Sequence, residues 1–149
     1  LFIARRLCIL AAEDVGLAYP QIIPIVKAAI DAAMYVGLPE ARIPLADAVI
    51  LVATSPKSNS GEAAIDAAMY DVEHGIGGDI PRTLQNKHFD GEDALVKGQH
   101  YLYPHSFKNH WVKQQYLPDN IKNKKYYNPK PNKYEDNLKK LHQEMKGGK

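Results

Sequence analysis

Cysteine and long hydrophobic runs are scarce in this chain of 149 residues. Cys8 is the single cysteine, which excludes an internal disulfide framework and favours a reducing compartment, the cytoplasm. No apolar run approaches the roughly 20 residues that a membrane-spanning helix needs, so we expect no membrane association. The opening LFIARRLCILAA resembles a signal peptide only superficially, because Arg5 and Arg6 interrupt it. We expect a fragment cut at or inside a helix, with Cys8 as an inert core thiol.

Sequence motifs for nucleotide binding and catalysis are also missing. The segment PKSNSGE offers Lys57 but lacks the glycine frame with which a P-loop holds phosphates. The sequence has no GxSxG, HExxH or paired-cysteine motif. His100, His105 and His110 recur every five residues, which fits no established helical pair of metal ligands, so we favour a rigid turn at residues 103–105 over a metal site. We therefore expect no catalytic, cofactor-binding or metal-binding residue in this chain.

One nearly uninterrupted apolar run, residues 45–53, has Asp47 as its single polar residue. Such a run can be a buried helix or a buried strand, because period alone does not separate the two in a short segment. Pro44 suits a first helical turn and Pro56 ends the run, which favours a helix. A helix that is apolar on all sides is normally buried on all sides. We therefore expect this helix at the centre of a core.

Helical patterns also occur on both sides of this run, and the predicted fold class is all-α. Residues 28–35 and 63–70 both read AAIDAAMY, which indicates two alanine-rich helices with closely packed neighbours; a duplicated helical hairpin is the alternative. The predicted helices cover residues 1–12, 20–36, 60–74 and 131–149.

Acidic residues near the end of the first helix need a partner. Glu13 and Asp14 lie close to the negative end of the helix dipole, which is locally unfavourable. We expect an ion pair with Arg5, Arg6 or Arg42; a catalytic pair of carboxylates is the alternative.

Other polar pairs predict local contacts within helices. Asn59 and Glu62 have the spacing of a capping box at the start of a helix. Glu135 and Lys139 are spaced as an i,i+4 ion pair in the final helix.

The character of the chain changes after Gly75. Residues 1–80 carry 5 basic residues (Lys and Arg) and 10 acidic ones (Asp and Glu). Residues 81–149 carry 14 basic and 7 acidic residues, so an acidic half precedes a basic half. The segment 76–130 has no sustained apolar period but is rich in aromatic residues, so we expect it to be irregular and pinned by its aromatic rings against the helical core. Short helices are expected at residues 81–85 and 110–116.

Basic and aromatic side chains alternate in residues 108–127. Single-strand binding proteins stack bases on aromatic rings in a positively charged groove, so this segment is a candidate nucleic-acid or partner patch. The alternative is that the rings face the core and the lysines face water, since no RNP, KH or helix-turn-helix signature is present. The candidate residues of the patch are Lys108, Lys113, Lys122, Lys124, Lys125, Trp111 and Tyr116.

Seven sequence blocks resemble the C-terminal region of the RarA/MgsA replication-associated recombination proteins. These are bacterial AAA+ ATPases related to the Werner-helicase-interacting proteins and to clamp loaders. The blocks follow one another in order over residues 1–130, and none is a catalytic motif. The family usually has an acidic residue after YPH, where this chain has Ser106. The blocks are ARRL at 4–7, EDVGLAYPQ at 13–21, RIPLADAV at 42–49, PKSNS at 56–60, YPH at 103–105, QQYLPD at 114–119 and YYNP at 126–129.

The resemblance implies an all-helical, collar-like domain that follows the ATPase module and assembles the protein into a homotetramer. It also implies a parent protein that hydrolyses ATP with Mg in a part upstream of this fragment, depends on DNA, associates with single-strand DNA-binding protein and works at the nucleoid.

We therefore interpret residues 1–149 as one C-terminal oligomerisation domain of a replication-associated AAA+ ATPase, with no chemistry of its own. Its parts are a helical core at 1–75, an irregular wrapping segment at 76–130 and a terminal helix at 131–149. A nucleic-acid-binding module at 108–127 is the alternative, and an independent enzyme using Glu13, Asp14 and the histidines is the third interpretation.

Overall fold

The computed structural model describes residues 1–147 except 86–89, 91–94, 96 and 98–100. Every regular element in this described part is a helix, which confirms the all-α fold class. The chain forms two compact units. Unit 1 contains Leu1–Asp66 and Tyr127–Lys139, and unit 2 contains Ala67–Tyr126 and the chain from Lys140 onward. The boundaries predicted at residues 75 and 130 remain a prediction.

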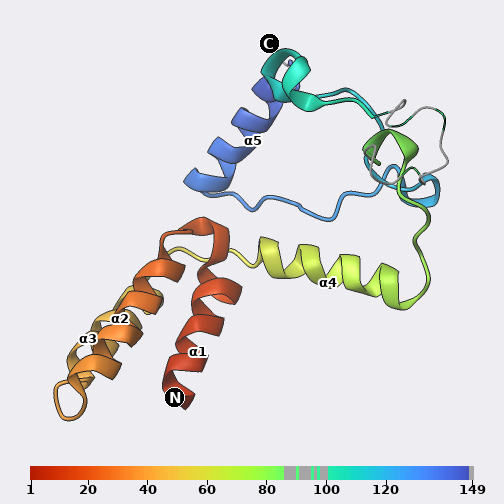
Figure 1. Cartoon of the computed structure of the whole chain (residues 1–149). Coiled ribbons are helices and arrows are strands. Elements are labelled where there is room, and N and C mark those ends of the chain that lie inside the picture. Colours follow the sequence, from red (N-terminus) through yellow and green to blue (C-terminus); the bar gives the residue numbers. More distant parts are fainter. Residues whose placement is uncertain (86–89, 91–94, 96, 98–100, 148–149) are drawn as a thin grey trace. The chain divides into compact units, whose positions relative to one another are not determined.

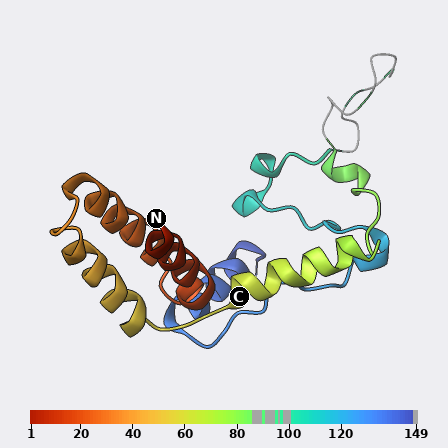
Figure 2. The same ribbon diagram turned by 90° about the horizontal axis from the view of Figure 1, so that it is seen from below.

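Unit 1 is built on three helices that lie side by side, α1 (Phe2–Leu10), α2 (Ile22–Val36) and α3 (Arg42–Thr54) (Figures 1 and 2). The helix α1 continues into a wider π-helical turn, Ala11–Val15, and then a 3₁₀ turn, Gly16–Ala18. The predicted helices over 1–12, 20–36 and the apolar run therefore all form. Their shared core consists of Leu7, Ala11, Val15, Ile22, Val26, Ile30, Ala48 and Val52.

The helix α3 is buried on one face only, so the prediction that it is buried on all sides is wrong. Ala48 and Val52 are its buried residues, and they belong to the core. Ile43 and Ile50 lie seven residues apart, hence on one face, and are 58% and 60% exposed. The physical reason is that α3 packs against α2 and α1 on one side, while its outer face meets solvent.

Two predictions about small features of unit 1 also need correction. Cys8 is exposed on α1 and is not a core thiol, because Leu7 takes the inward position at this turn. The ion pair expected for Glu13 and Asp14 does not form with any arginine in the described part of the chain.

Two further helices complete the regular structure, α4 (Ser60–Glu73) and α5 (Lys133–Met145). Both agree closely with the predicted ranges. Between them, the described residues form 3₁₀ turns at Arg82–Leu84, Pro104–Ser106, Lys108–His110 and Asp119–Ile121. The turn at Pro104–Ser106 confirms the rigid turn expected around the YPH block, and Arg82–Leu84 confirms a short helix within 81–85.

The helix predicted over 110–116 is wrong. Asn109 and His110 have φ angles of 58° and 53°, a left-handed conformation that a right-handed helix cannot contain. The backbone at Trp111 is extended instead.

The prediction that aromatic rings pin the irregular segment is wrong for most of them. Trp111 and Tyr126 are half-buried, but five other rings are at least a third exposed: Tyr101, Tyr103, Phe107, Tyr116 and Tyr127. Among the described residues of this segment, the buried side chains are the aliphatic Val112 and Ile121. Small aliphatic groups fill narrow spaces between irregular segments, whereas large rings remain at the surface.

No helix in the described part of the chain is long and apolar enough to cross a membrane.

Candidate interaction surfaces

The most strongly held side chain of unit 1 is the carboxylate of Glu135, which is fully buried. Ser58 donates a hydrogen bond to its Oε2 at 2.6 Å, and Tyr127 donates to its Oε1 at 2.9 Å. Asn132 also donates to Oε2, and the Asn132 side-chain oxygen accepts from the Glu135 backbone N–H at 2.9 Å. The last of these bonds caps the start of α5, because the Asn132 side chain accepts from a backbone N–H of the first helical turn.

Burial and hydrogen bonding act in opposite directions on Glu135. Burial alone raises the pKa of its carboxyl group, because it disfavours the charged form. The hydrogen bonds from the hydroxyl and amide groups outweigh burial and lower this pKa to about 2. The group is thus a buried anion held by neutral donors. The predicted ion pair between Glu135 and Lys139 is wrong, since Glu135 points inward.

A close backbone contact joins the segment that follows α1 to the segment that precedes α4. Ser58 N–H donates to the carbonyl oxygen of Asp14 at 2.8 Å. A Cβ atom at Gly16 would lie 2.6 Å from the Ser58 carbonyl oxygen, and Gly16 has a φ of +46°. Only glycine fits this position without a shift of backbone. The blocks EDVGLAYPQ and PKSNS therefore meet here, and the Ser58 hydroxyl in turn reaches Glu135.

A cleft of about 630 Å³ in unit 1 is lined by several charged side chains. Burial and the nearby Glu13 and Asp66 carboxylates raise the pKa of Glu62. The Lys57 ammonium donates to the carbonyl oxygens of Val52 and Ser55 at 2.8 and 2.5 Å, which caps the end of α3 and explains this lysine without a phosphate ligand. The cleft is lined by Glu13, Asp14, Lys57, Ser58, Asn59, Glu62, Lys130 and Pro131.

A second hollow in unit 1, which we call the apolar hollow, has a volume of about 270 Å³. It lies between the start of α1, the end of α2 and the turn into α3. Every residue that lines it is apolar: Leu1, Ile3, Ala4, Ile30, Ala33, Met34, Leu38, Ala41 and Leu45. Several of these side chains are well exposed, and Met34 is 72% exposed.

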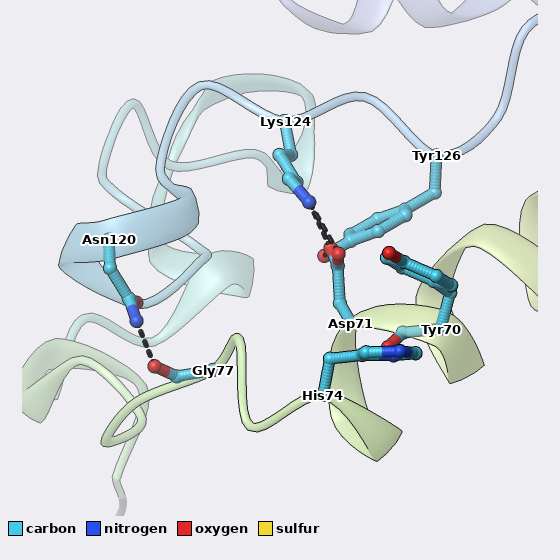
Figure 3. Close-up of polar contacts among 7 residues, drawn as sticks. All are labelled: Tyr70, Asp71, His74, Gly77, Asn120, Lys124 and Tyr126. Atoms are coloured by element: carbon cyan, nitrogen blue, oxygen red, sulfur yellow. Dashed lines mark hydrogen bonds and ion pairs between the residues drawn. The ribbon is translucent and has the colours of Figure 1, made fainter.

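Unit 2 contains an ion pair between a buried carboxylate of α4 and an exposed lysine of the segment that follows the 3₁₀ turn Asp119–Ile121 (Figure 3). The Lys124 ammonium lies 2.5 Å from the carboxylate of Asp71, which is 2% exposed, and the Tyr126 hydroxyl donates to the same carboxylate at 2.8 Å. The hydrogen bond from Lys124, followed by that from Tyr126, lowers the pKa of Asp71. Beside this pair, the His74 ring stacks on Tyr70 with centroids 4.0 Å apart.

Asp71→Asn is expected to lower the midpoint of thermal unfolding, because it leaves the Lys124 ammonium beside a neutral amide. Asp71 has a lowered pKa in the folded state, so its contribution to stability is present above its ordinary value of 3.8 and is lost as the pH falls below it. The variant should therefore differ from the parent chain at neutral pH and approach it in acid. Circular dichroism melts at about pH 7 and about pH 3 measure this. Asp79→Asn, at an exposed position of unit 2, is the control, and equal melts for the two variants at neutral pH would contradict the role of Asp71.

The structure separates the residues of the predicted basic-aromatic patch. Lys124 is held by Asp71 and is not a free cation. The other four lysines of the patch are exposed: Lys108, Lys113, Lys122 and Lys125.

The two aromatic residues of the patch are brought together. Trp111 and Tyr116 line one cleft of unit 2 with a volume of about 380 Å³. The Lys146 ammonium, outside the predicted patch, lies 5.8 Å from the centroid of the Trp111 ring.

The histidines considered for a metal site are only partly described. The rings of His105 and His110 lie 4.9 Å apart, and both residues are exposed. His100 lies outside the described residues. Within the described part, no group of three or more His, Cys, Asp or Glu side chains is placed to hold a metal ion. Glu13 and Asp14 belong to unit 1 and the two described histidines to unit 2.

Sequence reasoning missed Glu135 and Asp71, although one of them left a signal. Asn132 and Glu135 have the capping-box spacing, three residues apart, that was recognised at Asn59 and Glu62. For Asp71 no local pattern existed, because its partner lies 53 residues away.

Comparison with known proteins assigns the chain to a family. The family described as MgsA AAA+ ATPase C terminal matches residues 1–146. Replication-associated recombination protein A of Bacillus subtilis is 52% identical over 144 residues, which are 96% of this chain and 34% of that protein. An uncharacterised AAA domain-containing protein of Mycobacterium tuberculosis is 44% identical over 128 residues, 86% of this chain and 28% of that protein.

Replication-associated recombination protein A of Escherichia coli is 34% identical over 130 residues, 87% of this chain and 29% of that protein. The chain therefore spans 28–34% of the length of these relatives. The matched family covers both units and all the sequence blocks that carried the resemblance. The chain belongs to the MgsA AAA+ ATPase C-terminal family, and its relatives are replication-associated recombination proteins.

Proposed function

We propose that this chain is the assembly domain of a replication-associated AAA+ ATPase and that it joins four copies of the parent protein. The observation that carries the proposal is the amount of apolar side chain that unit 1 leaves at its surface. Met34 and Leu38 at the apolar hollow are 72% and 85% exposed. Large exposed apolar patches on proteins in water usually mark contact surfaces.

The outer face of α3, formed by Ile43 and Ile50, adds to this surface. Three helices in contact bury one core between them, and a helix at the edge of such a group leaves its second apolar face for another domain or another chain to cover. Rings of identical subunits cover such faces without leaving open ends. The number four follows from the family resemblance, since the residues alone do not set it.

The other parts of the proposal concern the parent protein. ATP and Mg would bind in the region that precedes this chain in longer relatives, and the relatives' names connect them with replication and recombination. In this proposal the assembled ATPase works in the cytoplasm at the nucleoid, on DNA and with single-strand DNA-binding protein, to maintain and repair replication forks. In this proposal the present chain contributes assembly and no catalytic group.

Assembly is tested by light scattering after size exclusion, at low salt and at about molar salt. We expect a mass of four times 16.6 kDa in both buffers, because the burial of apolar surface is not screened as charge pairs are. Met34→Asp at the apolar hollow should shift the chain to smaller species, because a charge would have to be buried in the contact. Ile80→Asp is the matched control, since Ile80 is also an exposed apolar residue, 62% exposed, but lies in unit 2.

Two results would contradict this proposal. A mass of 16.6 kDa for the unmodified chain in both buffers would exclude assembly through this domain. If the assembly dissociated only at high salt, or only after a charge-reversing substitution in the lysine-rich segment, the interface would be assigned to unit 2 and not to unit 1.

A further inference from the structure

Two histidine rings meet at the surface of unit 2. The rings of His105 and His110 have centroids 4.9 Å apart, and both residues are exposed. Their spacing along the chain fits no helical pair of metal ligands, but two successive 3₁₀ turns, Pro104–Ser106 and Lys108–His110, bring the rings together. All of these residues belong to unit 2. The fold therefore creates a pair of metal-ligating side chains that the spacing alone did not indicate.

The backbone beside this pair has an uncommon conformation. Asn109 and His110 have φ angles of 58° and 53°, in the left-handed region that residues other than glycine seldom adopt. Such conformations persist only where surrounding contacts hold them, and they are concentrated at functional sites. The Asn109 side-chain amide donates to the carbonyl oxygens of Glu144 and Met145, both at 3.3 Å. The turn that carries His110 is thus fixed to the end of α5.

The turn that carries His105 is fixed as well. The backbone N–H of Ser106 donates to the carbonyl oxygen of Tyr103, and that of Phe107 donates to the carbonyl oxygen of Pro104, both at 3.0 Å. The Tyr103 ring also lies against the His105 ring, with centroids 5.2 Å apart. Both backbone positions of the pair are therefore set by contacts, while the two exposed rings can turn about their Cβ–Cγ bonds.

The separation of the two rings is that of two imidazoles on one metal ion. A zinc–nitrogen bond is about 2.0–2.1 Å long, so the centre of a bound imidazole ring lies about 3.2 Å from the metal. Two such rings at the tetrahedral angle have centres about 5 Å apart. The observed distance of 4.9 Å matches this value. An ion can be shared once the rings turn one nitrogen each toward it, with no shift of the backbone.

The chemistry of the pair selects the kind of ion. Neutral imidazole suits zinc, copper and nickel, whereas magnesium and calcium prefer oxygen ligands. Two protein ligands are fewer than a closed structural site provides, so the remaining coordination positions stay open to water.

We propose that His105 and His110 together bind one divalent transition-metal ion, zinc or copper, at the surface of unit 2. The ordered turns place the two ligands in advance, so the ion is not required to fold this segment. The site is separate from the assembly surface of unit 1, and each proposal can fail without the other.

The tryptophan that follows His110 makes this proposal directly measurable. Trp111 is the single tryptophan of the chain, and a bound Cu²⁺ ion quenches the fluorescence of a nearby indole. The full 149-residue chain, without an affinity tag, is titrated with copper chloride by fluorescence and with zinc chloride by calorimetry. We expect saturable quenching by copper, binding of one zinc ion per chain, and no response to magnesium.

His110→Phe separates metal binding from ring packing. Phenylalanine keeps a flat ring beside His105 but offers no ligand nitrogen, so zinc binding should weaken at least about tenfold, and His105→Ala should have the same effect. His74→Ala is the matched control. His74 is also exposed and stacks on a ring, that of Tyr70, with centroids 4.0 Å apart, so its replacement should leave zinc binding unchanged.

Thermal unfolding provides a second readout. An ion that binds the folded chain and not the unfolded one raises the melting midpoint as the ion concentration rises. Zinc should therefore raise the midpoint of the parent chain and of His74→Ala. It should leave the midpoints of His110→Phe and His105→Ala where they are without zinc.

Three results would overturn the proposal. They are the absence of both copper quenching and zinc binding, zinc binding that His105→Ala and His110→Phe leave unchanged, and an equal loss of zinc binding in His74→Ala. Each of them would leave the two histidines as a stacked pair of rings without a metal.

Discussion

Replacing Glu135 with alanine is expected to lower the free energy of unfolding by about 3 kcal/mol, because it leaves several buried donors without their acceptor. Ser58 is 3% exposed and Glu135 is fully buried, so water cannot readily replace the lost carboxylate. Asn132 and Tyr127 lose the same partner. Urea or thermal unfolding followed by circular dichroism measures the loss. Asp136→Ala, at the next and exposed position of α5, is the matched control and should cost much less.

The same carboxylate should make unit 1 sensitive to acid. The pKa of Glu135 is about 2 in the folded chain and 4.5 ordinarily, so the unfolded chain takes up the proton first as the pH falls. Its contribution to stability is therefore complete above the ordinary value and is lost progressively between about pH 4.5 and about pH 2. Glu135→Ala should flatten this part of the curve of stability against pH. An unchanged acid transition in the variant would show that other groups control it.

Gly16→Ala is the second change expected to have a large effect. The added methyl group would lie 2.6 Å from the Ser58 carbonyl oxygen, which is backbone and cannot rotate away, at a φ of +46°. A clash and an unfavourable backbone conformation together should cost about 3 kcal/mol or more.

Gly61→Ala gives the contrast for this prediction. A Cβ at Gly61 meets nothing within 4 Å, and Gly61 lies in α4, so alanine there should stabilise the chain by up to about 1 kcal/mol. Comparing the two melts separates the local contact at Gly16 from a general effect of glycine replacement. Equal stability for Gly16→Ala and the parent chain would show that the Asp14–Ser58 contact is not rigid.

Much of the helical architecture could be predicted, because its signals are local. Pro44 and Pro56 mark the ends of the apolar run that became α3, and Gly37 follows α2 with a φ of +70°. The turn at Pro104 was likewise visible in the sequence. Proline fixes its own φ angle and glycine permits a positive one, whatever surrounds them.

Burial was harder to predict, because it depends on neighbours that are distant in sequence. The composition of α3 predicted that it is buried on all sides, yet its neighbours cover one face only. Glu135 shows the reverse error, since a glutamate spaced four residues before a lysine suggests a solvated ion pair. Its real partners include Ser58, 77 residues earlier, which no helical spacing could indicate.

For the candidate sites, too, the features with a local sequence signal could be predicted, and the contacts between distant residues could not. The aromatic character of residues 108–127 placed Trp111 and Tyr116 in one candidate patch, and in the structure both line one cleft. The sequence could not show that Lys146 lies beside Trp111, because α5 meets this segment only in the folded chain. It also could not show that Lys124 is paired, because its partner Asp71 lies 53 residues upstream.

The exposed outer face of α3 has a practical consequence for every stability measurement on this chain. If Ile43 and Ile50 are covered only when copies meet, then the dissociated and the assembled chain are different thermodynamic states, and the equilibrium between them follows mass action. The apparent melting temperature would then rise with protein concentration, and a dilute sample would melt earlier than a concentrated one of identical sequence. Variants compared at unequal concentrations would then differ in apparent melting temperature even where the substitution has no effect on stability.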